Sequence, residues 1–430
     1  MKKDFTTPYW WEEAPPKNFH VENWPALMDV VIIGGGFTGF GAAIKIAKAG
    51  LDVMILERDR VGEGASTRNG GITSGNLRLS FDTLRKRFGL QQAEAFFLEA
   101  KAAREDLFAF IRTEEIDCDL QPSGRFVGTT HLKALDGMKR DADHLSKLLD
   151  IKVTVHDSNT VPNHIDSKRY CGGMWRDDIS GIHPAKLLNG MVKVAKKAGV
   201  KIASQTQVLS VSREESVQDY PFELSTSRGL ISAGHVISAT NAYTDKTQPW
   251  LRRRLVPVIS EMIATENIGE NMVRSLMPSL SMHSELLELG FYFRPAPDRK
   301  RILLGGRRLN SNPSMARRRL KDGLISIFPQ LKEIGLSHHW FGFVAFPFDQ
   351  LPKLVVHDGI IYPCGYCGSG TVWARWLGQK AAQMVLGDLE PNIFQGKPFR
   401  TIPFYTGDPW FLPLAMKIYE LKDRFTTLKK

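Results

Sequence analysis

The feature that most constrains this chain is a glycine-rich turn between two apolar runs, in the stretch "DVVIIGGGFTGFGAAIKIAKAGLDVMILERD". Its pattern predicts strand, turn, helix and strand over residues 28–57. Gly34, Gly36 and Gly39 form G-x-G-x-x-G, in which the first glycine permits a tight turn, the second lets a pyrophosphate approach and the third allows close helix–strand packing. Glu57 ends the second strand about 20 residues further on, where a carboxylate can accept hydrogen bonds from ribose hydroxyls. The stretch therefore predicts a dinucleotide site.

The acid at the end of the second strand also restricts which dinucleotide can bind. A carboxylate at Glu57 repels the 2′-phosphate of NADP, which leaves NAD and FAD. In either case the free N–H groups and the positive end of the following helix would hold the diphosphate. The glycine fingerprint alone does not separate NAD from FAD.

Chain length and element order together predict two interleaved domains. At 430 residues the chain exceeds the usual size of a single core, and 43% hydrophobic with 24% charged residues is an ordinary globular composition. The strands expected for a nucleotide-binding sheet are interrupted by segments with a different pattern of elements, and further strands of the sheet follow near the C-terminus. The elements predicted beyond the first stretch are helices at 88–112 and 185–198, strands at 201–212 and 231–240, a strand-rich stretch from about 254 to 345, and a glycine turn opening a last helix with Gly387 near its end.

Targeting signals are not expected. No segment reaches the roughly 18 to 20 apolar residues that a bilayer span needs. Met1, Lys2 and Lys3 are followed by Asp4 and aromatic residues rather than by the apolar core of a signal peptide. We therefore expect a cytoplasmic protein.

The cysteines fit the same compartment. Cys118, Cys171, Cys364 and Cys367 are too few for a disulfide framework. The last two form one C-x-x-C, but neither a second such pair nor a nearby histidine pair supports zinc. We interpret them as loop cysteines and expect no metal site.

The chain is basic, with a net charge of +11 and a pI near 9.4. Three clusters carry much of the excess, but they lie far apart and no DNA-binding motif accompanies them, so nucleic acid is not an expected partner. We interpret them as a solvated basic surface; the alternative is contact with an anionic membrane surface or an acidic partner. The clusters are Arg252–Arg254, Arg299–Arg301 and Arg317–Arg319.

The string "VGEGASTRNGG", which follows the acid, resembles the G-x-G-A-S-x-R-N-G-G signature of the glycine/D-amino-acid oxidase (DAO) family of FAD enzymes, and most of all its γ-glutamylputrescine oxidase-type subgroup. Four further stretches match that subgroup in the same order, so the resemblance covers most of the chain. They are the aromatic leader "PYWWEEAPP", the strand "VISATNAYT", the hairpin "FYFRPAPDRKRILLGG" and the loop "GYCGSGTVWARWLG".

The resemblance implies an α/β fold with an α+β second part. A glutathione-reductase-like Rossmann FAD-binding domain would be interleaved with a substrate domain built on an antiparallel sheet. We accordingly expect an N-terminal arm at 1–27, the FAD-binding domain at 28–87, 175–250 and 346–392, the substrate domain at 88–174 and 251–345, and a C-terminal strap at 393–430.

The resemblance also implies FAD, which we expect to be bound non-covalently because Cys364 and Cys367 are out of register with the family's attachment position. The polar residues after Glu57 would meet phosphates and flavin edges, and the loop that opens the last helix would meet the flavin N1/C2 carbonyl edge. The residues expected at the cofactor are Gly34, Gly36, Phe37, Thr38, Gly39, Glu57, Arg58, Gly64, Ala65, Ser66, Arg68, Asn69, Gly70, Gly71, Ile72, Val208, Ala239, Thr240, Gly368, Ser369, Gly370, Thr371 and Val372.

One position departs from the family pattern. Glycine and D-amino-acid oxidases carry a carboxylate-binding arginine about five residues before Asp-x-x-Pro, but in "WFGFVAFPFDQLP" Val344 stands there. This disfavours a small free α-amino acid held in that way. Arg294 on a neighbouring strand is left either as an acid-binding residue or as a surface residue. The candidates for the substrate pocket are Tyr292, Arg294, Trp340 and Phe346.

We predict an oxidoreductase that oxidises the C–N bond of an amine or N-substituted amino acid by hydride transfer to flavin N5, after which the imine is hydrolysed. An aromatic, apolar pocket would lower the pKa of the amine and so provide its neutral form. Oxygen or another acceptor would reoxidise the flavin. Two alternatives stay open: a D-amino-acid-type dehydrogenase that passes electrons to a quinone chain, and a flavin-binding subunit of a larger complex. Separately, His183 is interpreted as a helix start signal rather than a catalytic group.

Overall fold

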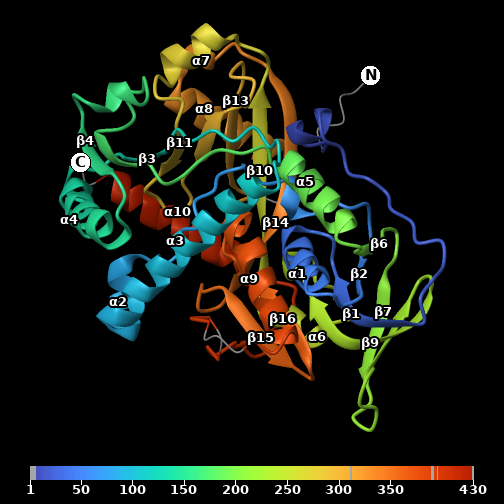
Figure 1. The fold of residues 1–430 in the computed structure, drawn as a ribbon. Helices are drawn as coiled ribbons and strands as arrows, with labels where there is room; N and C mark the ends of the chain where they lie inside the picture. Colours follow the sequence, from blue (N-terminus) through green and yellow to red (C-terminus); the bar gives the residue numbers. More distant parts are fainter. Residues whose placement is uncertain (1–5, 310–311, 389–391, 395, 429–430) are drawn as a thin grey trace.

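The computed structural model describes residues 6–309, 312–388, 392–394 and 396–428, so Met1 to Asp4 lie outside it. Its strands form two sheets (Figure 1). The α-helices are α1 (Phe37–Lys48), α2 (Phe81–Phe88), α3 (Leu90–Thr113), α4 (Leu132–Leu149), α5 (Pro184–Lys197), α6 (Pro249–Arg252), α7 (Glu270–Leu276), α8 (Pro313–Ile327), α9 (Gly370–Val385) and α10 (Leu412–Leu428). The strands are β1 (Leu27–Ile33), β2 (Val53–Leu56), β3 (Arg125–Thr129), β4 (Val153–Asp157), β5 (Gly172–Arg176), β6 (Lys201–Ala203), β7 (Val208–Arg213), β8 (Phe222–Thr226), β9 (Gly229–Ser238), β10 (Leu255–Thr265), β11 (Met282–Glu285), β12 (Tyr292–Pro295), β13 (Ile302–Arg307), β14 (Leu336–Pro347), β15 (Lys353–His357) and β16 (Ile360–Cys364).

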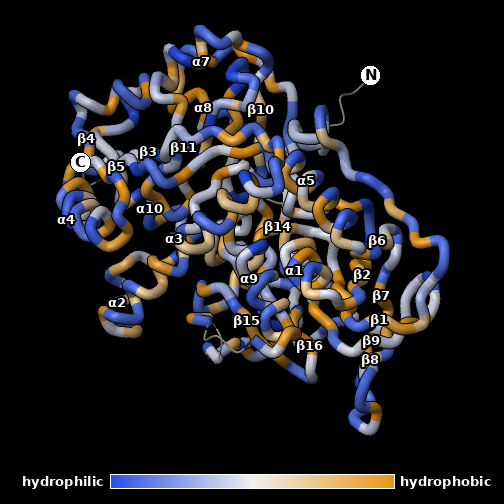
Figure 2. The backbone as a smooth tube through the Cα atoms, in the orientation of Figure 1, coloured by the Kyte–Doolittle hydropathy of each residue, from blue (hydrophilic) through white to orange (hydrophobic). Residues whose placement is uncertain are grey.

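The first sheet is built around the predicted nucleotide stretch. Its order is β15-β16-β9-β1-β2-β6, with β8 pairing β9 and β7 pairing β8. The pairs β1–β2, β1–β9, β2–β6 and β9–β16 are parallel. Side chains alternate across β1, with Val30 and Ile32 in the core beneath the helices and Val31 and Ile33 in the core of the opposite face. Such burial on both faces is typical of a central parallel strand, and Figure 2 shows the hydrophobic run.

Helices α1 and α9 cover one face of this sheet and lie side by side (Figure 1). They approach so closely that a Cβ at Gly378 would overlap the carbonyl oxygen of Thr38. A Cβ at Gly41 would lie 2.7 Å from the carbonyl oxygen of Arg375. The first and the last helix of the nucleotide sheet are therefore packed backbone to backbone, which brings both glycine turns to the same edge of the sheet.

The second sheet has the order β14-β10-β13-β12-β11-β3-β5-β4. Its pairs are antiparallel except β11–β3, which is parallel. Helices α7 and α8 cover one face, where Leu276, Leu320 and Leu324 belong to one apolar cluster. The opposite face is turned toward the first sheet. This mixed architecture confirms the expected fold class.

Most of the predicted elements are confirmed with small differences in their bounds. The helix expected at 88–112 is α3, and the one expected at 185–198 is α5. The segment 201–212 divides into β6 and β7, because Gln205 between them adopts a positive φ of 52°. The helix expected behind the glycine turn is α9, which ends at Val385 with Gly387 just beyond it at a φ of 75°, but it is not the last helix because α10 follows it.

The strands of the two sheets alternate along the chain. The first sheet takes segments 27–56, 201–238 and 353–364, and the second takes 125–176 and 255–347. Near the N-terminus, Tyr9–Glu12 forms a 3-10 turn whose Trp10 is completely buried. Near the other end, Asp423 of α10 accepts hydrogen bonds from the backbone N–H groups of Glu288 and Leu289, both at 2.8 Å. Both end segments therefore contact the second sheet or its loops.

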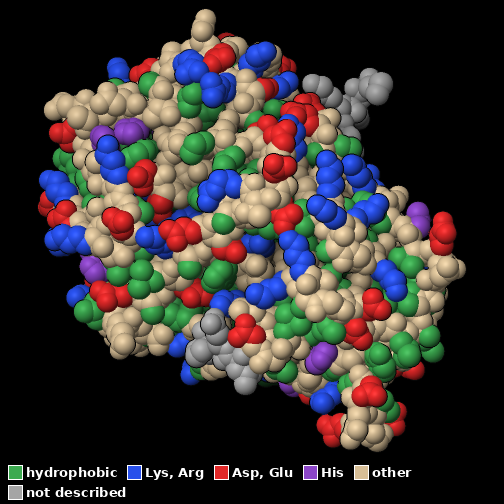
Figure 3. All heavy atoms as spheres, viewed as in Figure 1, with side chains coloured by type: hydrophobic (Ala, Val, Ile, Leu, Met, Phe, Trp, Pro, Cys, Tyr) green, Lys and Arg blue, Asp and Glu red, His purple; other side chains and the backbone are tan. Residues whose placement is uncertain are grey.

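Two arginines of the cluster at 252–254 have partners within the protein. Arg252 pairs with Asp408, and Arg254 donates to the carbonyl oxygens of Phe399 and Trp250. Figure 3 shows Lys and Arg side chains interspersed with Asp and Glu over the visible face. Within the described part of the chain, no helix combines the length and the apolar character needed to cross a membrane.

Candidate active site

A cavity of about 360 Å³ follows the glycine turn between β1 and α1. Gly34 adopts a φ of 111°, which favours glycine, and its N–H donates to the carbonyl oxygen of Leu56 at 2.8 Å. Helix α1 begins at Phe37, and its N-cap residue, Gly36, has no side chain that could cap it. Its positive end therefore faces the cavity, as an anion site requires.

Glu57 lies at the end of β2 and lines this cavity. One carboxylate oxygen accepts from the N–H of Gly35 at 2.7 Å, and the other accepts from the N–H of Asp59 at 3.0 Å. Burial raises the pKa of Glu57, while these two backbone hydrogen bonds act in the opposite direction. Each oxygen keeps a lone pair for a further donor, so the carboxylate is oriented but not saturated.

Ser66 connects the second glycine-rich string to the first. Its Oγ accepts from the N–H of Phe37 at 3.0 Å, directly at the start of α1. A Cβ at Gly36 would lie 2.8 Å from this oxygen. The two glycine strings therefore form one wall of the cavity, with a hydroxyl at the helix N-terminus.

Arg68 and Asn69 make their hydrogen bonds within the protein itself. Arg68 donates to the carbonyl oxygens of Glu63 and Phe341, at 2.6 and 3.2 Å, and stacks on Trp11. The amide of Asn69 donates to the carbonyl oxygens of Ala65 and Ser66, and its oxygen accepts from the N–H of Gly71 at 2.8 Å. Both residues line the cavity but shape the loop, whereas the sequence suggested that their polar groups meet phosphates and flavin edges.

The loop that opens α9 closes the far end of the cavity. Gly368, Gly370 and Thr371 line it, and the Thr371 hydroxyl donates to the side-chain oxygen of Asn69 at 3.3 Å. The Ser369 hydroxyl donates to the carbonyl oxygen of Asn76 at 2.6 Å. The N-terminus of α9 thus points at the place where the two glycine-rich loops meet.

A second cavity of about 340 Å³ adjoins the first. The two share lining residues, among them Asn69, Phe343, Val344 and Gly368. Its floor is the face of the second sheet that is turned toward the first sheet. Because side chains alternate along a strand, the register places these residues on one face: Val344 and Phe346 of β14, Val258 and Ser260 of β10, Arg307 of β13, Tyr292 of β12, Ser284 of β11 and Arg125 of β3.

Tyr292 lies at the junction of the sheet with the loop. Its hydroxyl is 3.0 Å from the Oγ of Ser260, and a Cβ at Gly70 would lie 2.9 Å from its ring. Burial raises the pKa of Tyr292, so the phenol stays protonated. Phe291, Phe343 and Phe346 also line this cavity, which is therefore partly aromatic.

Four charged side chains in or beside this second cavity are paired within the protein. Arg78 contacts Glu288. Glu285 accepts from Arg169 at 2.6 Å and from the hydroxyl of Tyr170 at 3.1 Å, and its other oxygen accepts from the N–H of Phe291. Arg68, which also lines this cavity, pairs with Glu63, so Arg125 and Arg307 are the two arginines of the cavity for which the described residues provide no ion pair.

Arg294 is completely buried, so the alternative of a surface role is wrong. It donates to the carbonyl oxygens of Gly71 and Ile182, at 2.6 and 2.8 Å, and to the side chain of Gln121. Burial lowers its pKa to about 9. Its place among carbonyl groups fits a residue that holds the loop at Gly71.

The structure places the expected site residues in three groups. The first cavity is lined by Gly34, Gly36, Phe37, Thr38, Glu57, Arg58, Gly64, Ala65, Ser66, Arg68, Asn69, Val208, Ala239, Thr240, Gly368, Gly370 and Thr371. The second is lined by Gly70, Ile72, Ser369, Tyr292 and Phe346, in addition to residues shared with the first. Neither is lined by Gly39, Gly71, Val372, Arg294 or Trp340. Trp340 instead donates its indole N–H to the carbonyl oxygen of Arg68 at 2.9 Å.

Several lining residues were not anticipated. Thr206 and Gln207 precede β7, and Tyr243 follows β9, both beside the first cavity. Thr206 and Gln207 also follow β6, and β6 and β9 are both parallel strands of the first sheet; this position is a signal that could have found them, since ligands bind at the carboxyl ends of parallel strands. Arg307 in the second cavity carried no motif, and only its register opposite Ser260 reveals it.

The two cysteines of the C-x-x-C are unlike each other. Cys364 is buried at the end of β16, and Cys367 lines both cavities. The thiol of Cys367 donates to the carbonyl oxygen of Gly365 at 3.3 Å. Burial raises the pKa of both thiols far above the ordinary range, which disfavours the reactive thiolate.

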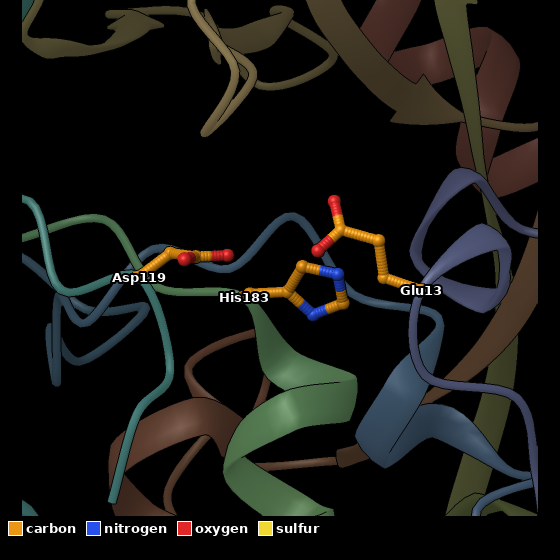
Figure 4. A group of neighbouring side chains, drawn as sticks. All are labelled: Glu13, Asp119 and His183. Carbon is orange, nitrogen blue, oxygen red and sulfur yellow. The ribbon is translucent and has the colours of Figure 1, made fainter.

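Outside these cavities, Glu13, Asp119 and His183 bring one ligand-type atom each to within 4.8 Å of one another (Figure 4). The ammonium of Lys186 already bridges the two carboxylates, at 2.6 Å from Glu13 and 2.9 Å from Asp119. His183 accepts from the N–H of Lys186 at 3.2 Å and so caps α5, as expected of a helix start signal. A lysine in this position makes the group an ion-pair network.

Comparison with known proteins gives a consistent result. The family model DAO, described as FAD dependent oxidoreductase, matches residues 29–384. The chain is 29% identical to gamma-glutamylputrescine oxidoreductase of Escherichia coli over 414 residues, covering 94% of this chain and 95% of that protein. It is 28% identical to the probable oxidoreductase OrdL of Rhizobium meliloti, covering 97% of both.

The fold has solved counterparts as well. Glycine oxidase from Geobacillus kaustophilus superposes with a TM-score of 0.68 at 20% identity, covering 88% of this chain and 99% of that one. L-amino acid deaminase from Proteus vulgaris superposes with a TM-score of 0.71 at 18% identity, covering 88% of this chain and 95% of that one.

Proposed function

Because the chain belongs to the DAO family of FAD-dependent oxidoreductases, we propose that it oxidises the C–N bond of an amine or an N-substituted amino acid held in the second cavity. Gamma-glutamylputrescine oxidoreductase and glycine oxidase, which the chain resembles, carry amine and amino-acid substrates in their names. FAD is the cofactor of the family, so the first cavity is the place to test for it.

The residues of the first cavity fit FAD. A partly buried carboxylate with free lone pairs, that of Glu57, stands where ribose hydroxyls would bind, and the start of α1, where Ser66 accepts from the N–H of Phe37, would hold the diphosphate. The loop from Gly368 to Thr371 would hold the ring end, with the N-terminus of α9 favouring negative charge there. We propose non-covalent binding, since both nearby thiols are held protonated by burial.

When bound, FAD supplies a hydride acceptor at N5. The chain contributes the surroundings of the substrate. Phe291, Tyr292 and Phe346 line an aromatic cavity, and burial in such a cavity lowers the pKa of an amine and yields the neutral form that can lose hydride from its α-carbon. Tyr292 holds its proton and presents its hydroxyl beside Ser260. The imine product is then hydrolysed by water.

The observation that carries this proposal is the junction of the two cavities. A dinucleotide-type groove and an aromatic cavity share the loop segments around Asn69 and Gly368. A cofactor ring at the end of the first groove would meet a substrate in the second. We further propose that the interleaved division expected from the sequence, with FAD-binding segments 28–87, 175–250 and 346–392, describes these two functional units.

The test is an anaerobic screen on the purified, FAD-loaded protein. Polyamines, N-methyl and N-carboxyalkyl amino acids, and D-amino acids are added separately, and bleaching of the visible flavin absorbance is followed. Bleaching by members of one class is the expected result. A protein that holds FAD but is bleached by none of them would instead be a binding subunit.

A second measurement separates the remaining enzyme classes. Oxygen consumption with peroxide release identifies an oxidase, whereas reduction of an artificial dye without peroxide identifies a dehydrogenase that serves another acceptor. Both are run with the substrate that bleaches the flavin. The same preparation with Glu57→Ala, which is expected to lose FAD, serves as the control for flavin-independent signal.

A further inference from the structure

The second cavity contains two arginines that form no ion pair with the described residues. Arg78 is paired with Glu288, and Glu285 is paired with Arg169. Arg125 and Arg307 also line the cavity, and among the described residues no carboxylate lies within ion-pair distance of either guanidinium. An unpaired cation in a partly buried cavity is costly unless a ligand supplies the opposite charge.

The two unpaired arginines differ in how much hydrogen bonding they have left. Arg125 donates to the hydroxyl of Ser284 at 2.7 Å, and the amide of Asn76, in the orientation that satisfies its neighbours, accepts from it at 3.0 Å. Arg307 donates once, to the carbonyl oxygen of Glu288 at 3.3 Å. Of its five N–H groups, four therefore have no acceptor among the described residues. Arg307 is the freer of the two.

Arg307 lies near Val344, the position at which the sequence lacks the family's carboxylate-binding arginine. In the register, both Arg307 of β13 and Gly342 of β14 pair with Ser260 of β10, so Val344 lies one step along the same face. The guanidinium of Arg307 lies 5.1 Å from the ring centre of Phe346, the next residue of β14 on that face. Its side chain therefore reaches across β10 to the neighbourhood of Val344. A cation from β13 stands close to the place that lacks the family's arginine on β14.

Arg307 keeps its charge in this setting. Burial lowers its pKa to about 10 and the neighbouring Arg78 acts in the same direction, whereas Glu288 acts in the opposite direction. The group is still a cation at neutral pH. A planar guanidinium with free donors, stacked on an aromatic ring, suits a bidentate carboxylate.

We propose that Arg307 binds a carboxylate of the substrate, so that the enzyme acts on amines that carry an acid group rather than on simple polyamines. This rests on the proposed function for the location of the substrate. Phe346 is the platform on which the guanidinium lies, and the Arg78–Glu288 pair stands beside it. The acid group would then sit in the second cavity while the amine end lies toward the shared loop.

The test uses phenylacetate and phenylacetamide, which differ in charge but hardly in shape. Their dissociation constants for the FAD-loaded enzyme are measured by calorimetry and by perturbation of the flavin spectrum. We expect phenylacetate to bind at least about tenfold more tightly than phenylacetamide, because charge-assisted hydrogen bonds are stronger than neutral ones. Arg307→Met should weaken phenylacetate about 10- to 100-fold and leave phenylacetamide nearly unchanged.

Three further variants complete the design. Arg274→Met, which removes an exposed arginine outside both cavities, is the matched control and should change both constants less than about threefold, whereas Arg125→Met tests the rival arginine of the same cavity. Arg307→Lys keeps the charge but not the fork of donors, and it should lose only part of the phenylacetate affinity. If Arg307→Met does not fold, Arg307→Lys still tests the proposal, because a weakened preference of this variant for phenylacetate over phenylacetamide supports it and an unchanged preference contradicts it.

The proposal is overturned if the unmodified enzyme does not prefer phenylacetate, or if the loss follows Arg125→Met instead. These outcomes are separate from failure of the proposed function, since ligand binding does not require turnover. If amines bleach the flavin but the enzyme binds phenylacetate no more tightly than phenylacetamide, the proposed function stands and the role of Arg307 is refuted.

Discussion

The indole N–H of Trp10 donates to the carbonyl oxygen of Asn69 at 2.8 Å. The two residues are 59 positions apart, and the indole comes from the short 3-10 turn near the N-terminus. Trp340 donates to the preceding carbonyl, that of Arg68, at 2.9 Å. Two buried tryptophans from opposite ends of the sequence thus fix consecutive peptide groups of the loop shared by both cavities.

Trp10→Phe is expected to weaken FAD binding about three- to tenfold, since it removes one buried hydrogen bond and keeps most of the apolar contact. The affinity is measured by titrating the apoprotein with FAD. Trp24→Phe is the matched control, because Trp24 makes the same kind of bond to the carbonyl oxygen of Leu230 at 2.9 Å on the exposed surface. Equal effects of the two substitutions would contradict a role of Trp10 in holding the loop.

Arg294→Met is expected to reduce the free energy of unfolding by about 3 to 5 kcal/mol, because it leaves the buried carbonyl groups of Gly71 and Ile182 without a donor. Urea denaturation measures the change. Arg274→Met, which breaks an exposed pair with Glu270, should cost less than about 1 kcal/mol. A stable Arg294→Met protein with weakened phenylacetate binding would instead make Arg294 a substrate residue.

His183 gives a prediction for the pH dependence of stability. Burial lowers its pKa from 6.5 to about 4, and its environment also contains Glu13, Asp119, Lys186 and Arg294. Because the unfolded chain binds the proton more readily, this contribution to stability is complete above about pH 6.5 and is lost as the pH falls toward 4.

Between pH 7 and pH 5 the loss from His183 should be about 2 kcal/mol. His183→Asn keeps an acceptor at the start of α5 but does not titrate. Between pH 7 and pH 5 the free energy of unfolding of this variant should therefore fall by about 2 kcal/mol less than that of the unmodified protein. Urea denaturation of both proteins at the two pH values provides the comparison. Parallel pH profiles would contradict the prediction.

Acid precipitation should release the flavin into the supernatant. Cys367, which lines both cavities, has a thiol pKa raised by burial and donates to the carbonyl oxygen of Gly365, so it is a poor nucleophile. Cys367→Ser should retain FAD with unchanged visible absorbance. A yellow pellet from the unmodified protein, together with a colourless one from Cys367→Ser, would show a covalent bond.

The elements of this protein that depend only on neighbouring residues could be predicted from the sequence. The turn between β1 and α1 is recognisable because three glycines and an acid stand at fixed spacings within one strand–helix–strand unit. The same holds for α9 behind its glycine loop. These elements need no knowledge of what packs on them, and for that reason they could be predicted.

The roles of individual side chains depended on distant segments. Arg68 turns to the carbonyl oxygen of Phe341, and Arg294 turns to Gly71, across separations of 273 and 223 residues. No spacing rule predicts such partners. The sequence alone does not reveal Arg307, because a charged residue at the end of a strand usually lies at the surface, and only the pairing of β13 with β10 places it at the cavity.

The first cavity has walls at Gly34, Val208, Thr240 and Gly368, which belong to segments scattered along the chain. During synthesis the ribosome must therefore deliver residues beyond Thr371 before the coenzyme can find a complete binding groove. Until then the parallel strands lack their last neighbours and the covering helix, a state exposed to proteases and to aggregation. Supply of FAD should thus govern how much newly made protein survives in the cell, as well as how much of it is active.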